Sequence, residues 1–166
     1  MRTCFESAGM ADIDRLVELR LAYLREDLGA LSAGDEARIR SRLPDYFRRH
    51  LGCDLTALAA RDGAAIVACA WLLAVEKPMS PAFINGKTGM VLNVYTRPEY
   101  RGRGYARRLM EMLMKEAASQ GLCVVELKAT RMGYGLYKSL GFEDAGTDYR
   151  GMIWKTASRS HKGANT

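Results

Sequence analysis

The sequence predicts one α/β domain built on a mixed sheet of the α+β type, and three observations point to it. The chain has 166 residues, the size of an ordinary domain with its own hydrophobic core. Its first strong strand signals are joined by a tight turn, which makes those strands antiparallel. Further along, a strand, an amphipathic helix and a strand follow one another at the length that a parallel crossover requires. We therefore expect antiparallel N-terminal strands and a central parallel strand-helix-strand unit, packed in three layers.

Two helices should come first. Asp12 is suited to the N-cap position, and the apolar residues after it fall on one helical stripe, which predicts a helix over residues 13–27. A second helix should begin near residues 35–36, and Pro44 should break or kink it before residues 45–51 continue.

Three strands should follow these helices. Residues 55–61 and 64–75 are strand-like, and the Asp62-Gly63 pair between them is a strong signal for an antiparallel hairpin. Residues 77–81 end the second strand, and residues 88–96 form the next one.

The second half of the chain should complete the sheet. Apolar residues at helical spacing over 106–117 predict a helix that Gly121 stops, and residues 122–129 should then run parallel to the preceding strand. The remaining expected elements are a short helix and two final strands, at residues 133–140, 142–147 and 149–154.

Composition places the chain among globular proteins. Hydrophobic residues make up 48% and charged residues 27%, which excludes a disordered or fibrous chain. No apolar run approaches the ~18 residues of a membrane span and the start carries charge, so we expect no secretory signal and a cytoplasmic protein. The polar, aperiodic end is typical of a tail, which gives one domain over residues 1–156 and a disordered tail over 157–166.

The cysteines and histidines do not indicate a metal site. The four cysteines lie far apart and form no CxxC pair, so we expect free buried thiols at Cys4, Cys53, Cys69 and Cys123. His50 and His161 have no other metal-ligating residues at a suitable spacing, and no bound metal is expected.

Residues 97–108 carry five arginines and one acid, a local net charge of +4, and they join a strand directly to a helix. The first N–H groups of a helix have no intrahelical partner and attract phosphate. Gly102 and Gly104 allow unusual torsions and a close approach of the backbone to a ligand. Together these features predict a loop that cradles a diphosphate.

Other interpretations of this loop compete with a diphosphate site. The loop could be a solvent-exposed turn of Arg and Gly that binds no ligand. A Rossmann dinucleotide site requires Gly where the chain has Arg107. It also requires a sheet that is parallel from the start, which the hairpin at 62–63 contradicts. A nucleic-acid contact stays open, although Arg-Gly segments of that kind usually lie in disordered tracts.

Two blocks of sequence resemble a known family. Residues 101–106, Arg-Gly-Arg-Gly-Tyr-Ala, match the Q/R-x-x-G-x-G/A signature of the GNAT superfamily of acyl-CoA-dependent N-acyltransferases. Residues 135–142 look like the LYxxxGF block of that family, about thirty residues downstream. The predicted order of elements also fits the family's fold from near Met1 to about Trp154. The resemblance therefore covers nearly the whole chain and implies a GNAT-like acyl-CoA N-acyltransferase fold.

The resemblance implies how acetyl-CoA, the co-substrate, is held. In this family it lies where two parallel strands splay apart, here residues 88–96 and 122–129. Backbone groups of Val94, Tyr95 and Thr96 would pair with the pantetheine arm, and a backbone N–H of that strand would stabilise the oxyanion. The loop that would hold the pyrophosphate consists of Arg101, Gly102, Arg103, Gly104, Tyr105 and Ala106.

The resemblance also implies a catalytic residue. Tyr137 matches the tyrosine of the LYxxxGF block, whose hydroxyl faces the cofactor sulfur, and a phenol can protonate a leaving thiolate. A tyrosine that only packs is the alternative. The general base stays unassigned, because Met90 stands where some members carry an acid or a histidine. Glu126, Glu76 and ordered water are candidates only.

The predicted function is transfer of the acetyl group of acetyl-CoA directly to a primary amine. A GNAT-like module that binds acyl-CoA or a partner protein without turnover is the alternative. The acceptor would be a small-molecule or peptide amine, selected by the first two helices and the loop over 78–87. No nucleic-acid or membrane partner is expected, and a homodimer stays open.

Overall fold

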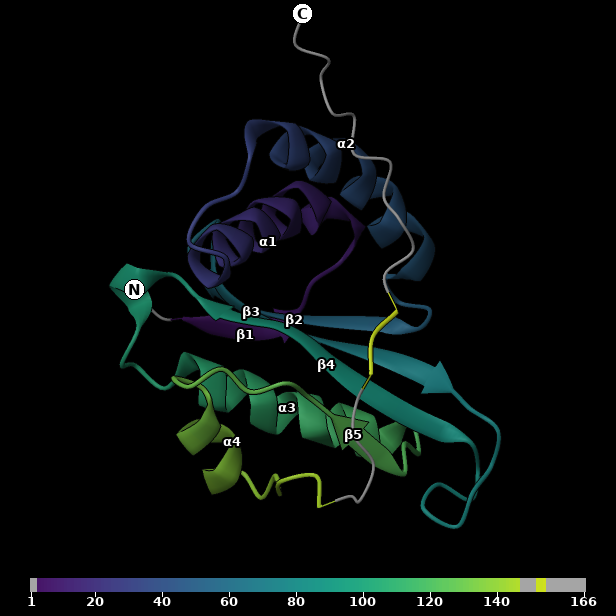
Figure 1. Ribbon diagram of the computed structural model, residues 1–166. Coiled ribbons are helices and arrows are strands. Elements are labelled where there is room, and N and C mark those ends of the chain that lie inside the picture. Colours follow the sequence, from purple (N-terminus) through teal and green to yellow (C-terminus); the bar gives the residue numbers. More distant parts are fainter. Residues whose placement is uncertain (1–2, 147–151, 155–166) are drawn as a thin grey trace, which may run out of the picture.

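The computed structural model describes residues 3–146 and 152–154. The strands are β1 (Cys4–Ser7), β2 (Leu55–Asp62), β3 (Ala65–Glu76), β4 (Lys87–Thr96) and β5 (Val124–Glu126). The helices are α1 (Ile13–Asp27), α2 (Ala33–His50), α3 (Tyr105–Ser119) and α4 (Tyr134–Ser139), with 3-10 turns η1 (Met10–Asp12) and η2 (Pro98–Tyr100). The sheet separates a layer of α1 and α2 from a layer of α3 and α4, which confirms the three-layer α/β architecture (Figure 1).

The order of strands in the sheet follows the chain, β1-β2-β3-β4-β5. Neighbouring strands from β1 to β4 are antiparallel, whereas β4 and β5 are parallel and are connected through α3. Between β2 and β3 the chain turns at Gly63, whose φ of 60° is one that glycine adopts without strain. The predicted mixed sheet and its hairpin are therefore confirmed.

The hydrophobic core has two parts, one on each face of the sheet. Alternate residues of a strand point to opposite faces. Cys69 and Trp71 of β3 accordingly pack on the side of α1 and α2, and Ala70 and Leu72 pack on the side of α3. Phe47 anchors α2 to the first part, because its fully buried ring meets the Trp71 ring edge-on at 5.2 Å.

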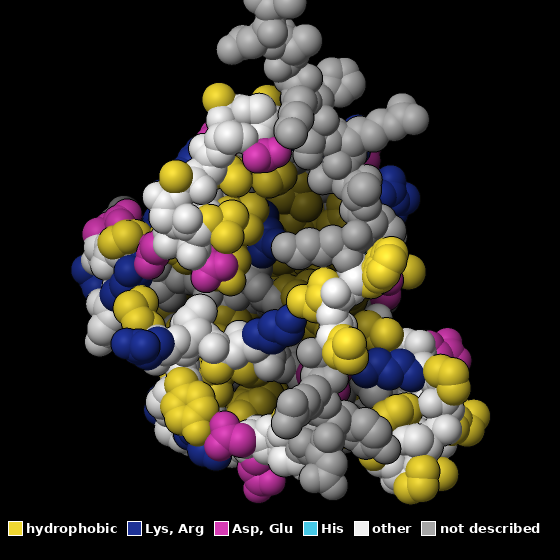
Figure 2. Space-filling view, viewed as in Figure 1, with side chains coloured by type: hydrophobic (Ala, Val, Ile, Leu, Met, Phe, Trp, Pro, Cys, Tyr) yellow, Lys and Arg dark blue, Asp and Glu magenta, His cyan; other side chains and the backbone are white. Residues whose placement is uncertain are grey.

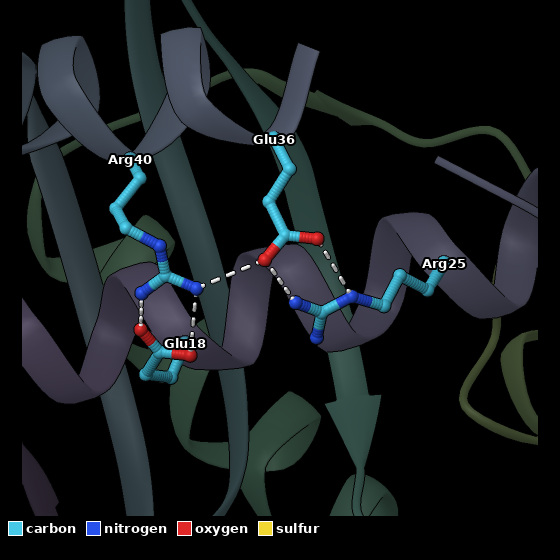
Figure 3. A network of polar contacts seen from close by, with 4 residues as sticks. All are labelled: Glu18, Arg25, Glu36 and Arg40. Atoms are coloured by element: carbon cyan, nitrogen blue, oxygen red, sulfur yellow. Dashed lines mark hydrogen bonds and ion pairs between the residues drawn. The ribbon is translucent and has the colours of Figure 1, made fainter. Parts of the chain in front are cut away.

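Charged side chains join α1 to α2 at the surface (Figure 3). Glu36 of α2 accepts hydrogen bonds from Arg25 of α1 and from Arg40, one helical turn further along α2. Arg40 also pairs with Glu18 of α1. The network adds to the core packing between the two helices, although surface ion pairs contribute only modestly to stability.

The N-terminal region differs from the sequence prediction in three ways. No sequence pattern predicted β1, which is short and pairs with the end of β2, so its partner rather than its own pattern makes it a strand. Pro44 does not break α2, because proline removes one backbone hydrogen bond and this helix is mostly exposed to water. Asp12 precedes α1 but does not cap it with its side chain, which instead accepts from Gly9 N–H and from Arg61.

The C-terminal part contains less strand than predicted. The strand expected over 122–129 is limited to β5, with three residue pairs to β4. The prediction of two final strands is wrong for the residues that the structure describes, because residues 142–146 and 152–154 form no strand. The other residues of those two segments, and the predicted tail at 157–166, lie outside the described residues.

The expectation of buried thiols is correct only for Cys69. All four cysteines are free, but Cys4, Cys53 and Cys123 are exposed. Burial raises the pKa of the Cys69 thiol to about 12, which keeps it protonated at neutral pH.

Two kinds of feature are absent from residues 3–146 and 152–154. None of the helices there is both long and apolar enough to cross a membrane. No group of three or more His, Cys, Asp or Glu residues in the same part of the chain could hold a metal ion.

Candidate active site

A β-bulge interrupts β4 at Asn93. Cys69 of β3 pairs with Tyr95 and Trp71 pairs with Leu92, so three steps along β4 face two steps along β3. Asn93 is the extra residue and has a φ of 49°, the only positive φ of a non-glycine residue in the described part of the chain. Asparagine tolerates this conformation better than most residues. Its buried side chain also donates to Cys69 Sγ at 3.4 Å, which holds the bulge in place.

Beyond the bulge, one edge of β4 has no neighbouring strand among the described residues. The ladder between β4 and β5 stops at the pair Met90 and Glu126, three residues before the bulge. Bulges bend the strand that carries them, which accounts for the divergence of the two strands at this point. Before it they lie close, since a Cβ on Gly89 would lie 3.4 Å from Val125 Cγ2 of β5.

Backbone groups on this open edge can be assigned from the ladder on the other edge. Arg97 N–H donates to Val67 O of β3 at 2.9 Å. Successive residues of a strand direct their N–H groups to opposite edges, so Tyr95 N–H points toward β3. The N–H groups of Val94 and Thr96 therefore point away from β3. The open edge offers hydrogen-bonding groups that an extended ligand can use as a neighbouring strand would.

The loop after β4 has the geometry that the glycines predicted. Gly102 and Gly104 have φ values of 73° and 77°, and a Cβ at either position would meet no atom within 4 Å. The first bond inside α3 runs from Arg108 N–H to Gly104 O at 3.0 Å. The three N–H groups before it, of residues 105–107, therefore have no intrahelical acceptor. An open helix start of this kind suits a phosphate group.

The arginines of the loop are held by the protein itself. Arg101 pairs with Glu26 of α1 and also donates to Thr96 O at 3.0 Å. Arg103 donates to Glu99 O, and Arg107 donates to Ser139 Oγ of α4 at 2.7 Å. These bonds position the loop between α1 and α4, so the groups it leaves open to a ligand are mainly backbone N–H groups.

Tyr137 is positioned by the residues around it in the LYxxxGF block. Phe142 N–H donates to Tyr137 O, and Gly141, with a φ of 91°, donates to Lys138 O, which together form a Schellman motif at the end of α4. The Phe142 ring packs edge-on against the Tyr137 ring at 5.9 Å. A Cβ on Gly133 would lie 2.9 Å from Tyr137 Cε2, so glycine leaves room for the ring.

The Tyr137 side chain is 9% exposed and lies in the same hydrophobic cluster as Val91 and Val94 of β4. Among the described residues its hydroxyl has no hydrogen-bond partner. Burial, and to a smaller degree the nearby Tyr23 hydroxyl, raises the pKa of Tyr137. The phenol is therefore protonated at neutral pH, as a proton donor must be.

The acids considered as general bases lie at the edge of the site. Glu126 is opposite Met90 where the strands diverge, but its carboxylate pairs with Lys77 at 3.2 Å. Glu76 is exposed at the end of β3. His50 makes a hydrogen bond to Asp54 and stacks on Tyr46 at the end of α2. None of these contacts singles out one base.

Sequence reasoning missed Asn93 and Arg20. Asn93 had a usable signal, since asparagine is depleted in strands and tolerates a positive φ. Arg20 had none, because an arginine among the polar residues of an amphipathic helix looks like a solvated one. In the structure it is half-buried, and its Nη1 donates to Asn93 Oδ1 at 3.1 Å.

Comparisons with known proteins agree with this geometry. The chain is 28% identical to a predicted acetyltransferase with acetyl-CoA from Clostridium acetobutylicum, with a TM-score of 0.81 over 92% of this chain and 96% of that one. A GCN5-related N-acetyltransferase from Ralstonia eutropha JMP134 gives 25% identity and a TM-score of 0.77, over 91% of this chain and 99% of that one.

A curated relative matches over a shorter region. N-acetyltransferase 8B of Rattus norvegicus is 27% identical over 99 residues, which are 58% of this chain and 43% of the relative. The chain thus spans less than half the length of that relative. The model of the acetyltransferase (GNAT) family matches residues 15–142, most of the chain and all of the site described above. The chain belongs to the acetyltransferase (GNAT) family.

Proposed function

We propose that the protein is an acetyl-CoA-dependent N-acetyltransferase, formed by residues 1–156 as one domain, that acetylates a primary amine of a small molecule or peptide. The observation that carries the proposal is the open edge of β4, which begins at a bulge and ends at the open N-terminus of α3. An extended ligand with amide groups at one end and a diphosphate at the other matches both features.

The residues present fit acetyl-CoA. Val94 and Thr96 direct their N–H groups to the open edge, and Thr96 Oγ1 is buried without a partner in the described part of the chain. The N–H groups of Tyr105 and Ala106 would receive the pyrophosphate, with Gly102 and Gly104 allowing its close approach. When bound, acetyl-CoA supplies the thioester whose acetyl group passes to the amine.

Two groups of the chain would carry the chemistry. The Val94 N–H, next to the bulge, would stabilise the oxygen that gains negative charge during attack. The Tyr137 hydroxyl would donate the proton that the departing sulfur needs. An N–C bond forms, a C–S bond breaks, and overall one proton moves from the amine nitrogen to the sulfur.

The test combines binding with turnover. Acetyl-CoA should raise the melting temperature, because a ligand in 100-fold excess over its Kd stabilises the native state by about 2.7 kcal/mol. A panel of primary amines should then release CoA, measured with a thiol reagent, and give N-acetylated products by mass spectrometry.

Each alternative has its own outcome. Stabilisation by acetyl-CoA without CoA release from any amine would favour an acyl-CoA-binding module that does not turn over. Displacement of acetyl-CoA by RNA or DNA would favour nucleic-acid binding at the arginine loop. Absence of any stabilisation would reject the proposed function.

A further inference from the structure

Arg20 lies on α1 beside the bulge, and the reaction proposed above does not use it. Its Nη1 donates to Asn93 Oδ1 at 3.1 Å, and its guanidinium lies 5.4 Å from the centre of the Tyr23 ring. Tyr23 in turn meets the Tyr95 ring edge-on at 6.4 Å. Arg20 therefore reaches the residue that precedes Val94, next to where the amine would react.

The charge of Arg20 is poorly compensated. Its guanidinium has five N–H donors, and Asn93 Oδ1 is its one hydrogen-bond acceptor among the described residues. No carboxylate of that part of the chain lies within ion-pair distance. Burial lowers the pKa of Arg20, and Tyr23, Asp27, Cys69 and Tyr46 offset this only in part. A half-buried cation without an anionic partner is unfavourable, and a bound anion would correct it.

The contrast with other arginines supports a special role. Eight others each form an ion pair with a carboxylate, namely Arg15, Arg25, Arg38, Arg40, Arg48, Arg61, Arg101 and Arg108. Seven of them are at least about one third exposed, so water also solvates them, and the less exposed Arg61 of β2 has two carboxylate partners, Glu6 and Asp12. Arg20 faces the sheet and has lost part of that solvation.

The surroundings of Arg20 suit a small ligand. Tyr23 and Tyr46 are half-buried and Tyr95 is nearly buried, so their rings can pack against carbon atoms of a ligand. Figure 2 shows this face hollowed between the helices α1 and α2 and the sheet, with mostly hydrophobic side chains around the hollow and a Lys or Arg side chain beside it.

We propose that Arg20 binds an anionic group of the amine acceptor, a carboxylate or a phosphate, so that the acceptor is a small amine that also carries negative charge. The inference rests on the proposed function, because it concerns the acceptor of that reaction. An anion held by Arg20, next to Asn93, would direct the amine toward Val94 N–H. The guanidinium fork binds either anion through charge-assisted hydrogen bonds.

Matched acceptors test the inference. Glycine, β-alanine and γ-aminobutyrate would each be compared with the corresponding carboxamide, and phosphoethanolamine with ethanolamine. The amine of a carboxamide is less basic than that of its acid, so chemistry alone favours the carboxamide. Wild-type enzyme should nevertheless give the higher kcat/KM with the anionic member of at least one pair. A preference in the amino-acid pairs would identify a carboxylate as the anion that Arg20 binds, and a preference for phosphoethanolamine would identify a phosphate.

Two variants locate the preference. Arg20→Gln keeps a donor for Asn93 but removes the charge, and should reduce the preference for the anionic member by about 30-fold or more. The preference is the ratio of the two kcat/KM values within a pair, so a general loss of activity in the variant would not imitate its loss. Arg25→Gln removes a charge from the same helix outside the site and should keep the full preference.

The outcomes separate this inference from the proposed function. An anion preference unchanged in Arg20→Gln, or CoA release only with uncharged amines, would overturn the role of Arg20 and leave the acetyltransferase intact. No CoA release with any amine would reject the proposed function. In that case calorimetric titration of the CoA complex with the same pairs still tests anion binding by Arg20. Wild type should bind the anionic member of a pair more tightly than the uncharged one, and Arg20→Gln should not.

Discussion

The two edges of β4 differ in how completely their backbone groups are used. Toward β3, pairing continues along nearly the whole strand, from Lys87 to Thr96, and is interrupted only at the bulge. Toward β5, pairing covers three residues and then stops at Met90. The first edge joins β4 to the core, where β3 is buried on both faces, and the second leaves hydrogen-bonding groups for a ligand. Under the proposed function, stability and chemistry therefore depend on opposite edges of one strand.

The largest expected effect is on turnover, at Tyr137 on the open side. Tyr137→Phe keeps the packing against Phe142 and removes only the hydroxyl, so kcat should fall by roughly 10²- to 10⁴-fold, the range for loss of a general acid. Acetyl-CoA affinity and melting temperature should change little. Steady-state kinetics and calorimetric titration of the same preparation give the two values.

Tyr134→Phe is the matched control for this variant. Tyr134 lies on the same helix, but its hydroxyl donates to Asp144 at the surface. It should therefore keep wild-type turnover. Wild-type turnover in Tyr137→Phe would show that Tyr137 only packs, and equal losses of affinity and kcat would make it a binding residue.

The paired side should respond in the opposite way. Leu72 of β3 is 1% exposed and lies opposite Val91, so Leu72→Ala leaves a cavity and should lower the free energy of unfolding by about 2–5 kcal/mol. Urea denaturation measures this loss. At a temperature where the variant is folded, kcat should stay close to that of wild type. A strong loss of kcat without loss of stability would contradict the division between the two edges.

A smaller effect is expected in the loop that follows the open edge. Valine at Gly104 must adopt a left-handed φ, at a cost of roughly 1–3 kcal/mol, and its side chain would occupy the space proposed for the diphosphate. The increase in melting temperature on adding acetyl-CoA should be lost in Gly104→Val.

Gly63→Val is the control that separates the effect of backbone strain from the loss of acetyl-CoA binding. Gly63 also has a positive φ and open space around it, but it lies in the β2–β3 turn. This variant should be destabilised to a similar degree and still respond fully to acetyl-CoA. A full response in Gly104→Val would reject the diphosphate site.

The smallest effect is expected far from β4, in the network between α1 and α2. Hydrogen bonds from Arg25 and Arg40 lower the pKa of Glu36, so its contribution is complete above the ordinary pKa of glutamate and is lost as the pH falls through the lowered value. Glu36→Gln should lower the melting temperature by less than about 4 °C at neutral pH and change neither kcat nor acetyl-CoA affinity. The difference from wild type should shrink in acid or high salt; a difference that persists there would refute an electrostatic origin.

The fold was largely predictable because its signals are local. Residues 13–27 show a helical period, and Asp62-Gly63 marks a turn whatever surrounds it. The loop glycines and the LYxxxGF block also have local causes, since Gly102, Gly104 and Gly141 all have the positive φ values that favour glycine.

The features that were not predicted depend on distant partners. β1 is a strand because β2 lies beside it, and β5 is short because β4 bends away. Arg20 differs from a surface arginine only because α1 places it over the bulge at Asn93. No window of sequence contains both members of these pairs.

Amide hydrogen exchange along β4 tests the central claim most directly, because it compares the two edges within one strand. Residue-resolved exchange would be measured by NMR with and without saturating CoA. Val94 and Thr96 N–H groups should exchange fast in the free protein and at least about tenfold more slowly when CoA is bound, whereas Tyr95 N–H, which points toward β3, should already be protected without CoA. Bound CoA that leaves Val94 and Thr96 exchange unchanged would show that the open edge of β4 does not hold the cofactor.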